Sequence, residues 1–413
     1  MAIEFGAVRA PRNLVFGAGQ RAALPDYAAA LGKRALFVTD ERMAGEPVFA
    51  ELHDQLEAAG LAVSVFRGTL PELPAECIAD GVTQGRDFGA DLIVGIGGGS
   101  CMDAAKIMAI LLAHGGDIVD YYGEFKVPGP VLPLICVPTT AGTGSEVTPV
   151  AVVSDKGRAV KVGIASPYLI PHTAICDPEL TYGCPPGLTA VSGADALTHA
   201  IEAFTTARRA PGGKLVHEHV FLGKNALSDL YALEAIRLIG RSLARAVHDG
   251  SDREARVDMM LGASLAGLAF GTAGTAAAHA VQYPIGALTH TAHGLGVAAM
   301  MPYVMEFNLP MATHDMAVIA LALGLHVSDR SVEGQAAAAI DGVAALFAEI
   351  GIPPDIKTLG MREDKLDWTA EQALAATRLV KNNPRPLDRD SMGLLVTAAY
   401  LGDRAMLRHS NSH

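Results

Sequence analysis

The sequence predicts an α/β domain with a mostly parallel sheet, followed by an all-helical domain. The chain has 413 residues, more than a single hydrophobic core usually supports. The first part alternates short β-rich runs with helical stretches, which is typical of βαβ units. After Pro185 and Pro186 the sequence becomes alanine-rich with helical periodicity nearly to its end. We therefore place the α/β domain at residues 1–186 and the all-helical domain at 187–413.

The individual elements follow from local patterns. Short β-rich runs predict strands at 35–39, 62–66, 92–96 and 134–138. Helix-period apolar residues that end in glycine predict helices within 47–60 and 76–89. The second domain is expected to contain long helices at about 189–206, 226–248, 253–271, 313–323 and 333–350. Glycine, proline and basic residues between 205 and 225 indicate an exposed loop.

Composition and charge limit the partners of the protein. Apolar residues make up 50% and charged residues 18% of the chain, as in a well-buried globular protein. The net charge of -12 argues against a nucleic-acid groove or an anionic membrane surface, because both favour clustered Lys and Arg. The five cysteines show no C-x-x-C spacing, and the sequence has neither a secretory signal nor a long uncharged apolar run. We expect a cytoplasmic homodimer or higher homo-oligomer that binds a small molecule, without nucleic-acid or membrane partners.

A glycine-rich turn follows the strand expected at 92–96. Gly97, Gly98, Gly99 and Ser100 separate this strand from the start of a helix. Glycines let backbone amides approach an anion, and the helix N-terminus adds unpaired N–H groups, which suits a pyrophosphate. A tight strand-to-helix turn without a ligand is the competing interpretation, but the strand before and the helix after favour the phosphate site.

Polar residues also follow two other predicted strands. Asp40 comes directly after the strand at 35–39, where a carboxylate can bind the ribose hydroxyls of NAD and repel the extra phosphate of NADP. The same residue could equally cap a helix. A run of hydroxyls and glycines at 139–146 follows the strand at 134–138. Open α/β sheets bind ligands at this end of their strands, although an ordinary turn would have a similar composition.

The first helix of the second domain carries a carboxylate and an imidazole four residues apart. Asp195 and His199 would lie one above the other and could both face one ion. His279 and His293, later in the chain, complete a possible set of ligands. One Asp and three His suit a borderline divalent cation such as Fe(II) or Zn(II). By itself, such a pair is usually a solvated helix face, so the rest of the chain decides between the interpretations.

Taken together, these motifs resemble the iron-containing alcohol dehydrogenase family over nearly the whole chain. The resemblance rests on the order and spacing of 97–103, 138–146, 195–202 and the pair His279 and His293. It implies a Rossmann-like NAD-binding domain, an all-helical metal-binding domain and a catalytic cleft between them. It places the metal ligands on Asp195, His199, His279 and His293. It places cofactor contacts on Asp40, Gly97, Gly98, Gly99, Ser100, Thr139, Thr140, Thr143 and Lys161.

One position departs from the simple alcohol dehydrogenases of this family. Those members often carry a histidine four residues after the third ligand, a residue assigned to relay the alcohol's proton to solvent. This chain has Tyr283 there, and a tyrosine is a poor general base at neutral pH, although it can form hydrogen bonds. Tyr283 with Pro284 resembles the hydroxyacid-oxoacid transhydrogenase branch, as do the segments 222–229 and 246–256.

We therefore expect an NAD-dependent, iron-containing alcohol dehydrogenase that moves hydride between a small primary alcohol or hydroxyacid and its aldehyde or ketone. The cofactors would be NAD and Fe(II), with Zn(II) as the alternative metal, and the metal would polarise the substrate oxygen. The expected catalytic set is Asp195, His199, His279, His293 and Tyr283. Two alternatives stay open: a transhydrogenase that retains NAD, and an NAD- and metal-dependent lyase or cyclase with the architecture of dehydroquinate synthase. Lys381 or Arg385 near the cleft would favour a hydroxyacid.

Overall fold

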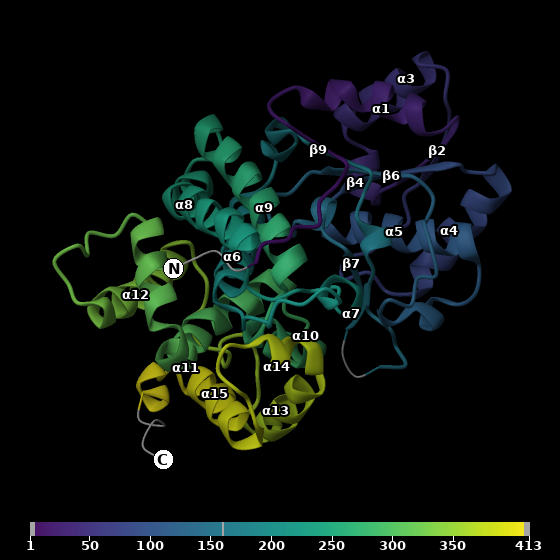
Figure 1. Cartoon of the computed structure of the whole chain (residues 1–413). Coiled ribbons are helices and arrows are strands. Elements are labelled where there is room, and N and C mark those ends of the chain that lie inside the picture. The colour runs from purple at the N-terminus through teal and green to yellow at the C-terminus, as the bar shows by residue number, and fades with distance from the viewer. Residues whose placement is uncertain (1–4, 159–160, 409–413) are drawn as a thin grey trace. The chain divides into compact units, whose positions relative to one another are not determined.

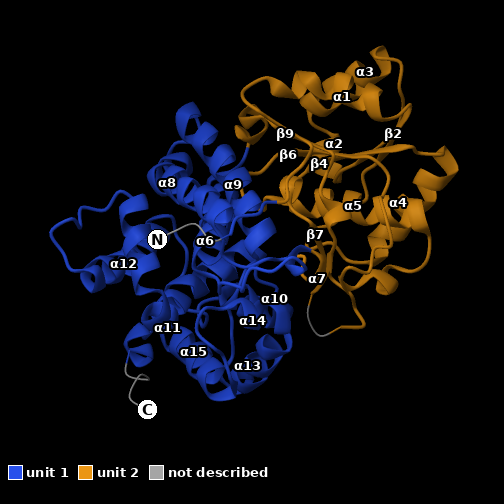
Figure 2. Ribbon diagram, viewed as in Figure 1, with its two compact units in different colours: residues 1–8, 184–216, 221–413 blue, residues 9–183, 217–220 orange. Residues whose placement is uncertain are grey.

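Figure 1 shows the computed structural model of the chain, which describes residues 5–158 and 161–408. The chain divides into two compact units (Figure 2). An α/β unit contains residues 9–183 and 217–220, and a helical unit contains residues 1–8, 184–216 and 221–413. The predicted fold class, a mostly parallel sheet followed by an all-helical region, is confirmed.

A six-stranded parallel sheet lies at the centre of the α/β unit. Its strands follow the order β1-β9-β6-β4-β2-β3. Their bounds are β1 (Asn13–Phe16), β2 (Arg34–Val38), β3 (Ala62–Phe66), β4 (Leu92–Gly97), β6 (Leu134–Pro138) and β9 (Thr173–Cys176). The runs predicted as strands form β2, β3, β4 and β6. The strands β1 and β9 were not predicted, and each of them has only four residues.

Helices cover both faces of this sheet (Figure 1). The side chains of β2 alternate, so that Leu36 and Val38 pack in one apolar cluster and Ala35 and Phe37 in another. The helices of the unit are α1 (Leu24–Leu31), α2 (Glu41–Ala44), α3 (Pro47–Ala58), α4 (Glu76–Phe88) and α5 (Gly99–His114). A second, three-stranded sheet has the order β5 (Gly123–Glu124), β8 (Val162–Ala165) and β7 (Val150–Val153).

The helical unit is built mainly from α-helices, several of which are long. Their bounds are α6 (Pro186–Thr205), α8 (Ala226–His248), α9 (Arg253–Ala273), α10 (Ala277–Thr289), α11 (His293–Ala322), α12 (Val332–Glu349), α13 (Leu366–Ala375), α14 (Thr377–Asn382) and α15 (Arg389–Leu401). Four of the five long helices expected here are confirmed as α6, α8, α9 and α12. The prediction for 205–225 was incomplete, because the short helix α7 (Leu215–Glu218) interrupts the loop.

The fifth expected helix, at 313–323, is only the last part of α11. This helix begins at His293 and has a non-helical residue, Ala312, in its interior. Its first half is buried on nearly every side and contains Pro302. A helix that is apolar all round shows no amphipathic period, and an internal proline usually indicates a helix end. The predicted start of this helix, at residue 313, was therefore wrong.

A sharp turn joins α9 to α10, the helix that carries His279. The two helices are bent by 102° across residues 274–276. Gly274 has a φ of +90°, which favours glycine, and Asn382 donates hydrogen bonds to the carbonyls of Ala273 and Thr275. The direction of α10 is thus fixed directly before the candidate ligand. Among the described residues no single helix has the length and apolarity to span a membrane; α9 and α10 meet the criterion only as a bent pair.

Candidate metal centre and cofactor loop

Helix α6 places Asp195 and His199 on a buried face. The two residues are 3% and 5% exposed, because α6 packs against α8, α9 and α11. Asp195 Oδ1 lies 3.7 Å from His199 Nε2. The i,i+4 spacing therefore brings both side chains together, and the alternative of a solvated helix face is wrong for this pair.

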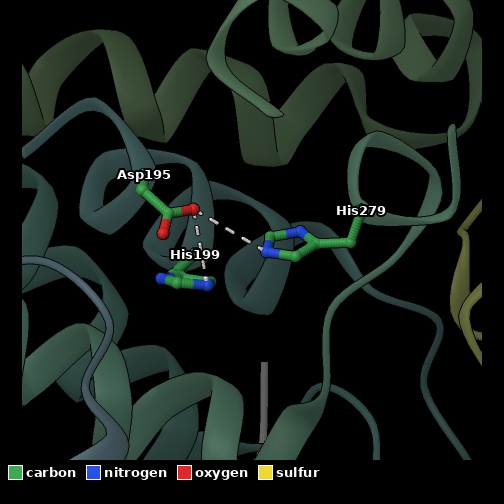
Figure 3. Close-up of side chains that lie close together, drawn as sticks. All are labelled: Asp195, His199 and His279. Carbon is green, nitrogen blue, oxygen red and sulfur yellow. Dashed lines mark ion pairs between the residues drawn. The ribbon is translucent and has the colours of Figure 1, made fainter. Parts of the chain in front are cut away.

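Helix α10 adds His279 to this pair, as Figure 3 shows. Its Nε2 atom lies 3.9 Å from the same Asp195 oxygen. One ligand atom from each of the three residues lies within 4.8 Å of the others. The His199 ring is stacked between those of Phe270 and His279, with centroid distances of 4.2 and 4.8 Å. Segments far apart in the sequence thus converge on one buried cluster of potential metal ligands.

His293 lies beside this cluster. It is the first residue of α11 and is half-buried, with its ring centroid 5.4 Å from that of His279 and 6.2 Å from that of Tyr283. The next residue, Gly294, allows the start of α11 to approach α6 closely. A Cβ atom there would lie 2.6 Å from the Val191 carbonyl oxygen and 2.9 Å from the Asp195 Cβ. The structure therefore brings all four predicted ligands and Tyr283 into one region.

One buried carboxylate that was not predicted as a site residue contacts the cluster. Glu202 is 1% exposed, and its Oε2 accepts a hydrogen bond of 2.6 Å from His279 Nδ1. The same carboxylate accepts hydrogen bonds from the backbone N–H groups of Ala276 and Ala278. Glu202 follows His199 by three residues, and such residues are neighbours on a helix surface. The spacing of three residues from His199 could therefore have indicated that Glu202 lies beside the cluster.

The cluster fits a divalent cation. Two ligands that are each 2.0–2.2 Å from a tetrahedral ion lie about 3.3–3.6 Å apart. The separations of 3.7 and 3.9 Å from Asp195 Oδ1 to the two imidazole nitrogens are close to that range. His279 Nε2 is buried and has no hydrogen-bond partner within residues 5–158 and 161–408. Buried polar atoms normally have a partner, and an ion would supply one here.

In the α/β unit, the glycine-rich turn joins β4 to the N-terminus of α5. A Cβ at Gly97, where φ is +145°, would lie 2.6 Å from the Cys101 sulfur, and one at Gly99 would lie 2.6 Å from Thr143 Cγ2. A larger residue at either position would have to displace the Cys101 or Thr143 side chain. Thr140 borders the turn, 3.7 Å from a Cβ placed on Gly98. The turn, Thr140 and Thr143 therefore surround the first turn of a long helix, where backbone N–H groups are available to an anion.

Two buried charged residues hold α5 in this position. Asp103 accepts hydrogen bonds from Ser145 Oγ and the backbone N–H of Val152, and burial raises the pKa of its carboxyl group. Lys106 donates to the carbonyls of Thr148 and Val150, and burial lowers the pKa of its ammonium group. These contacts connect α5 to the segment after β6 that carries the threonines. Asp103 follows the glycine turn closely in the sequence because it anchors the helix that begins at this turn.

Asp40 caps helix α2, which is one of the two roles that were expected for it, the other being a contact to the ribose of NAD. Its Oδ1 accepts a hydrogen bond of 2.8 Å from the backbone N–H of Met43, at the start of α2. Its Oδ2 accepts a weak hydrogen bond from Cys101 and lies 3.8 Å from a Cβ placed on Gly97. Asp40 thus caps a helix and also lies next to the glycine turn. Burial raises the pKa of the Cys101 thiol, so this residue serves packing rather than reactivity.

The remaining candidates have partners within their own units. Thr139 donates its backbone N–H to the carbonyl of Gly97, at the end of β4. Lys161 forms an ion pair with Glu72. Arg385 donates to the carbonyl of Phe307 and lies over its ring at 4.2 Å, so its guanidinium is held against α11. The idea that Arg385 selects a hydroxyacid has no support in these contacts.

Comparisons with known proteins identify one family. A family profile described as "Iron-containing alcohol dehydrogenase" matches residues 11–178, and one described as "Fe-containing alcohol dehydrogenase family, C-terminal" matches residues 189–400. The long-chain-alcohol dehydrogenase 1 of Geobacillus thermodenitrificans is 37% identical over 373 residues, which is 90% of each chain.

Solved structures agree with these sequence matches over nearly the whole chain. A 1,3-propanediol oxidoreductase is 33% identical, with a TM-score of 0.90 over 96% of this chain and 100% of the other. The sulfoacetaldehyde reductase of Bifidobacterium kashiwanohense, solved in complex with NAD+, is 28% identical, with a TM-score of 0.81 over 97% of this chain and 99% of the other. The matches therefore include both the α/β unit and the helical unit.

Proposed function

The chain belongs to the iron-containing alcohol dehydrogenase family, and from this premise we propose that it moves hydride between NAD and a small primary alcohol or hydroxyacid at a metal ion. It is an NAD-dependent oxidoreductase that acts on alcohols and aldehydes. The observation that carries the proposed chemistry is the buried cluster of Asp195, His199 and His279. Burying a carboxylate is costly unless its charge is compensated. A divalent cation bound by this carboxylate and the two imidazoles would compensate it.

We propose that Asp195, His199, His279 and His293 hold this ion. When bound, a divalent ion supplies a Lewis acid that lowers the pKa of an alcohol and polarises a carbonyl oxygen. Asp195 contributes a negative charge directly at the cluster. Phe270 stacks on His199 and covers one face of that ring against water. Because the cluster is buried, water does not compete for its donor atoms. The side chains packed around the cluster keep these atoms oriented before the substrate binds.

We propose that the glycine turn binds the pyrophosphate of NAD and that Asp40 selects NAD over NADP. The N-terminus of α5 offers N–H donors, while the Asp40 carboxylate lies beside the turn. The variant Asp40→Asn keeps an oxygen that can cap α2 but removes the negative charge. We expect its KM for NAD to rise about tenfold and its discrimination against NADP to fall, as measured by steady-state kinetics with both cofactors. Unchanged cofactor preference in this variant would argue against the assignment.

The proposed function is tested on protein purified without oxygen. The metal content is measured, the metal is removed by chelation, and Fe(II) or Zn(II) is added back separately. Reduction of NAD is followed at the absorbance band of NADH with a panel of primary alcohols and hydroxyacids. We expect turnover to vanish with the metal and to return with at least one of the two ions. Full activity in metal-stripped protein would exclude the proposal.

A second candidate is a hydroxyacid-oxoacid transhydrogenase that retains NAD, and Tyr283 is the observation that favours it. This tyrosine stands where a relay histidine is common, and its ring lies 6.2 Å from that of His293. A transhydrogenase would be stimulated by an added oxoacid in the absence of free NAD. Strict dependence on added NAD would exclude it. Tyr283→His compared with Tyr283→Phe separates a relay from simple packing, since only the histidine variant would gain activity at neutral pH.

A further inference from the structure

We infer that Glu202 is a positioning residue that prepares His279 for metal binding. This inference rests on the proposed function, because it assigns His279 to the metal. Glu202 does not belong to the cluster of ligand atoms itself. It acts instead through the other nitrogen of the His279 ring, at 2.6 Å from Nδ1.

Glu202 determines which nitrogen of the His279 imidazole carries the proton. A carboxylate only accepts hydrogen bonds, so the Nδ1 atom of His279 must carry the proton that it donates to Glu202. In the neutral ring, the Nε2 atom then presents its lone pair toward Asp195, 3.9 Å away. The opposite tautomer would put a hydrogen on Nε2 and could not bind a cation. Glu202 thus selects the form of His279 that binds metal.

Glu202 also caps α10, the helix that carries His279. Ala276, the N-cap residue of α10, has no side chain that could cap the helix. Glu202 supplies the cap from α6, since its two oxygens accept hydrogen bonds of 2.9 and 2.7 Å from the N–H groups of Ala276 and Ala278. A negative charge also suits the positive end of the helix dipole. One carboxylate therefore fixes both the backbone and the ring of His279.

Glu202 is a buried carboxyl group, 1% exposed, and no Lys or Arg of the described chain forms an ion pair with it. A buried carboxylate is costly unless its charge is compensated. The two buried carboxyl groups of Asp195 and Glu202 would balance the two positive charges of one divalent ion. Metal binding should therefore stabilise the fold, and part of that stabilisation should depend on Glu202.

The test compares Glu202→Gln with a matched control, Glu306→Gln. Glutamine has nearly the same shape but offers only one acceptor oxygen, so its NH2 group must face an N–H donor of His279, Ala276 or Ala278. Glu306 is also buried, at 3% exposed, but it pairs with Arg408. We expect a 10–100-fold lower affinity for Zn(II) or Co(II) in Glu202→Gln, measured by competition with a chelator. Glu306→Gln should bind these metals as tightly as the native protein.

Two readouts separate positioning from a general loss of stability. Native protein should gain thermal stability on addition of Zn(II), and Glu202→Gln should gain less, whereas Glu306→Gln should gain as much as native protein. The Nδ1–H resonance of His279 should be visible by NMR in the native protein and shifted or lost in Glu202→Gln. If Glu202→Gln does not fold, Glu202→Asp keeps the charge and serves in its place, with weaker metal binding expected because the shorter side chain cannot keep all three hydrogen bonds.

The outcomes also separate this inference from the proposed function. Native protein that binds no metal, or that turns over without it, overturns both. Native protein that needs metal, together with a Glu202→Gln variant of unchanged metal affinity, overturns only the role of Glu202. An equal loss of affinity in Glu202→Gln and Glu306→Gln also overturns it, because the effect would then reflect stability alone.

Discussion

Two helices of this protein each carry a carboxylate and an imidazole four residues apart, in opposite order, yet only one pair has the properties of a ligand set. In α6, Asp195 and His199 lie four residues apart with 3.7 Å between Oδ1 and Nε2. In α3, His53 and Glu57 have the same spacing, with 3.8 Å between Nδ1 and Oε2. The side chains of the α6 pair are 4% and 6% exposed, whereas those of the α3 pair are 28% and 56% exposed. Spacing alone therefore does not distinguish a metal centre from a surface.

The surroundings of the two pairs explain the difference. In the α/β unit, the third potential ligand beside His53 is Asp54, whose side chain is 81% exposed. Water competes for such groups, and an exposed ion pair contributes little free energy. In the helical unit, the third potential ligand is the buried His279, which is itself held by Glu202. A ligand set thus requires burial and a distant element that supplies and orients the third group.

The largest expected effect comes from removing a ligand of the buried cluster. His279→Ala and Asp195→Ala should each lose bound metal and lower kcat by about a thousandfold or more, because several kcal/mol of charge stabilisation disappears. Metal content by elemental analysis and steady-state kinetics measure this effect. If such a variant kept both the metal and turnover, the buried pair in α6 would be no more important for metal binding than the exposed pair in α3.

A smaller effect is expected where α11 meets α6. Gly294→Ala would place a Cβ 2.6 Å from the Val191 carbonyl oxygen, and we expect a loss of about 1–3 kcal/mol in the free energy of unfolding and weaker metal binding. The matched control is Gly393→Ala in α15, where no atom lies within 4 Å of the added Cβ. That variant should gain about 0.5–1 kcal/mol. Denaturant unfolding of both proteins tests the pair, and equal stability would mean that the close approach is unimportant.

The smallest effect is expected in α3. His53→Ala should leave metal content, kcat and KM unchanged and should alter the free energy of unfolding by less than about 1 kcal/mol. Its ring contacts Phe37 at a centroid distance of 6.4 Å, so a slight loss of packing is the only consequence expected. Elemental analysis and denaturant unfolding provide the measurement. Loss of bound metal in this variant would show that the exposed pair also binds an ion.

Local patterns were sufficient for the elements that have strong periodicity. The strand at 134–138 occurs as predicted, because a strand buried in a parallel sheet is a continuous apolar run. The strand at 62–66 also occurs as predicted, although it is a half-buried edge strand, because Val63 and Val65 favour β structure. The turn at 97–100 was found because glycine is required there for steric reasons. By contrast, β1 is a short edge strand whose side chains are only half-buried, and it pairs with β9, far away in the sequence. Such a strand exists because of its partner, so its own residues give little signal.

The order of residues along the chain is enough to identify a glycine turn, a carboxylate and an imidazole at helical spacing, and two later histidines. Tertiary packing decided that Asp195 and His199 are buried and that the corresponding pair in α3 is not. It also decided that Glu202 holds His279 and caps α10. The physical reason is that burial and hydrogen bonding depend on elements far apart in the chain, whereas spacing is a local property of one helix.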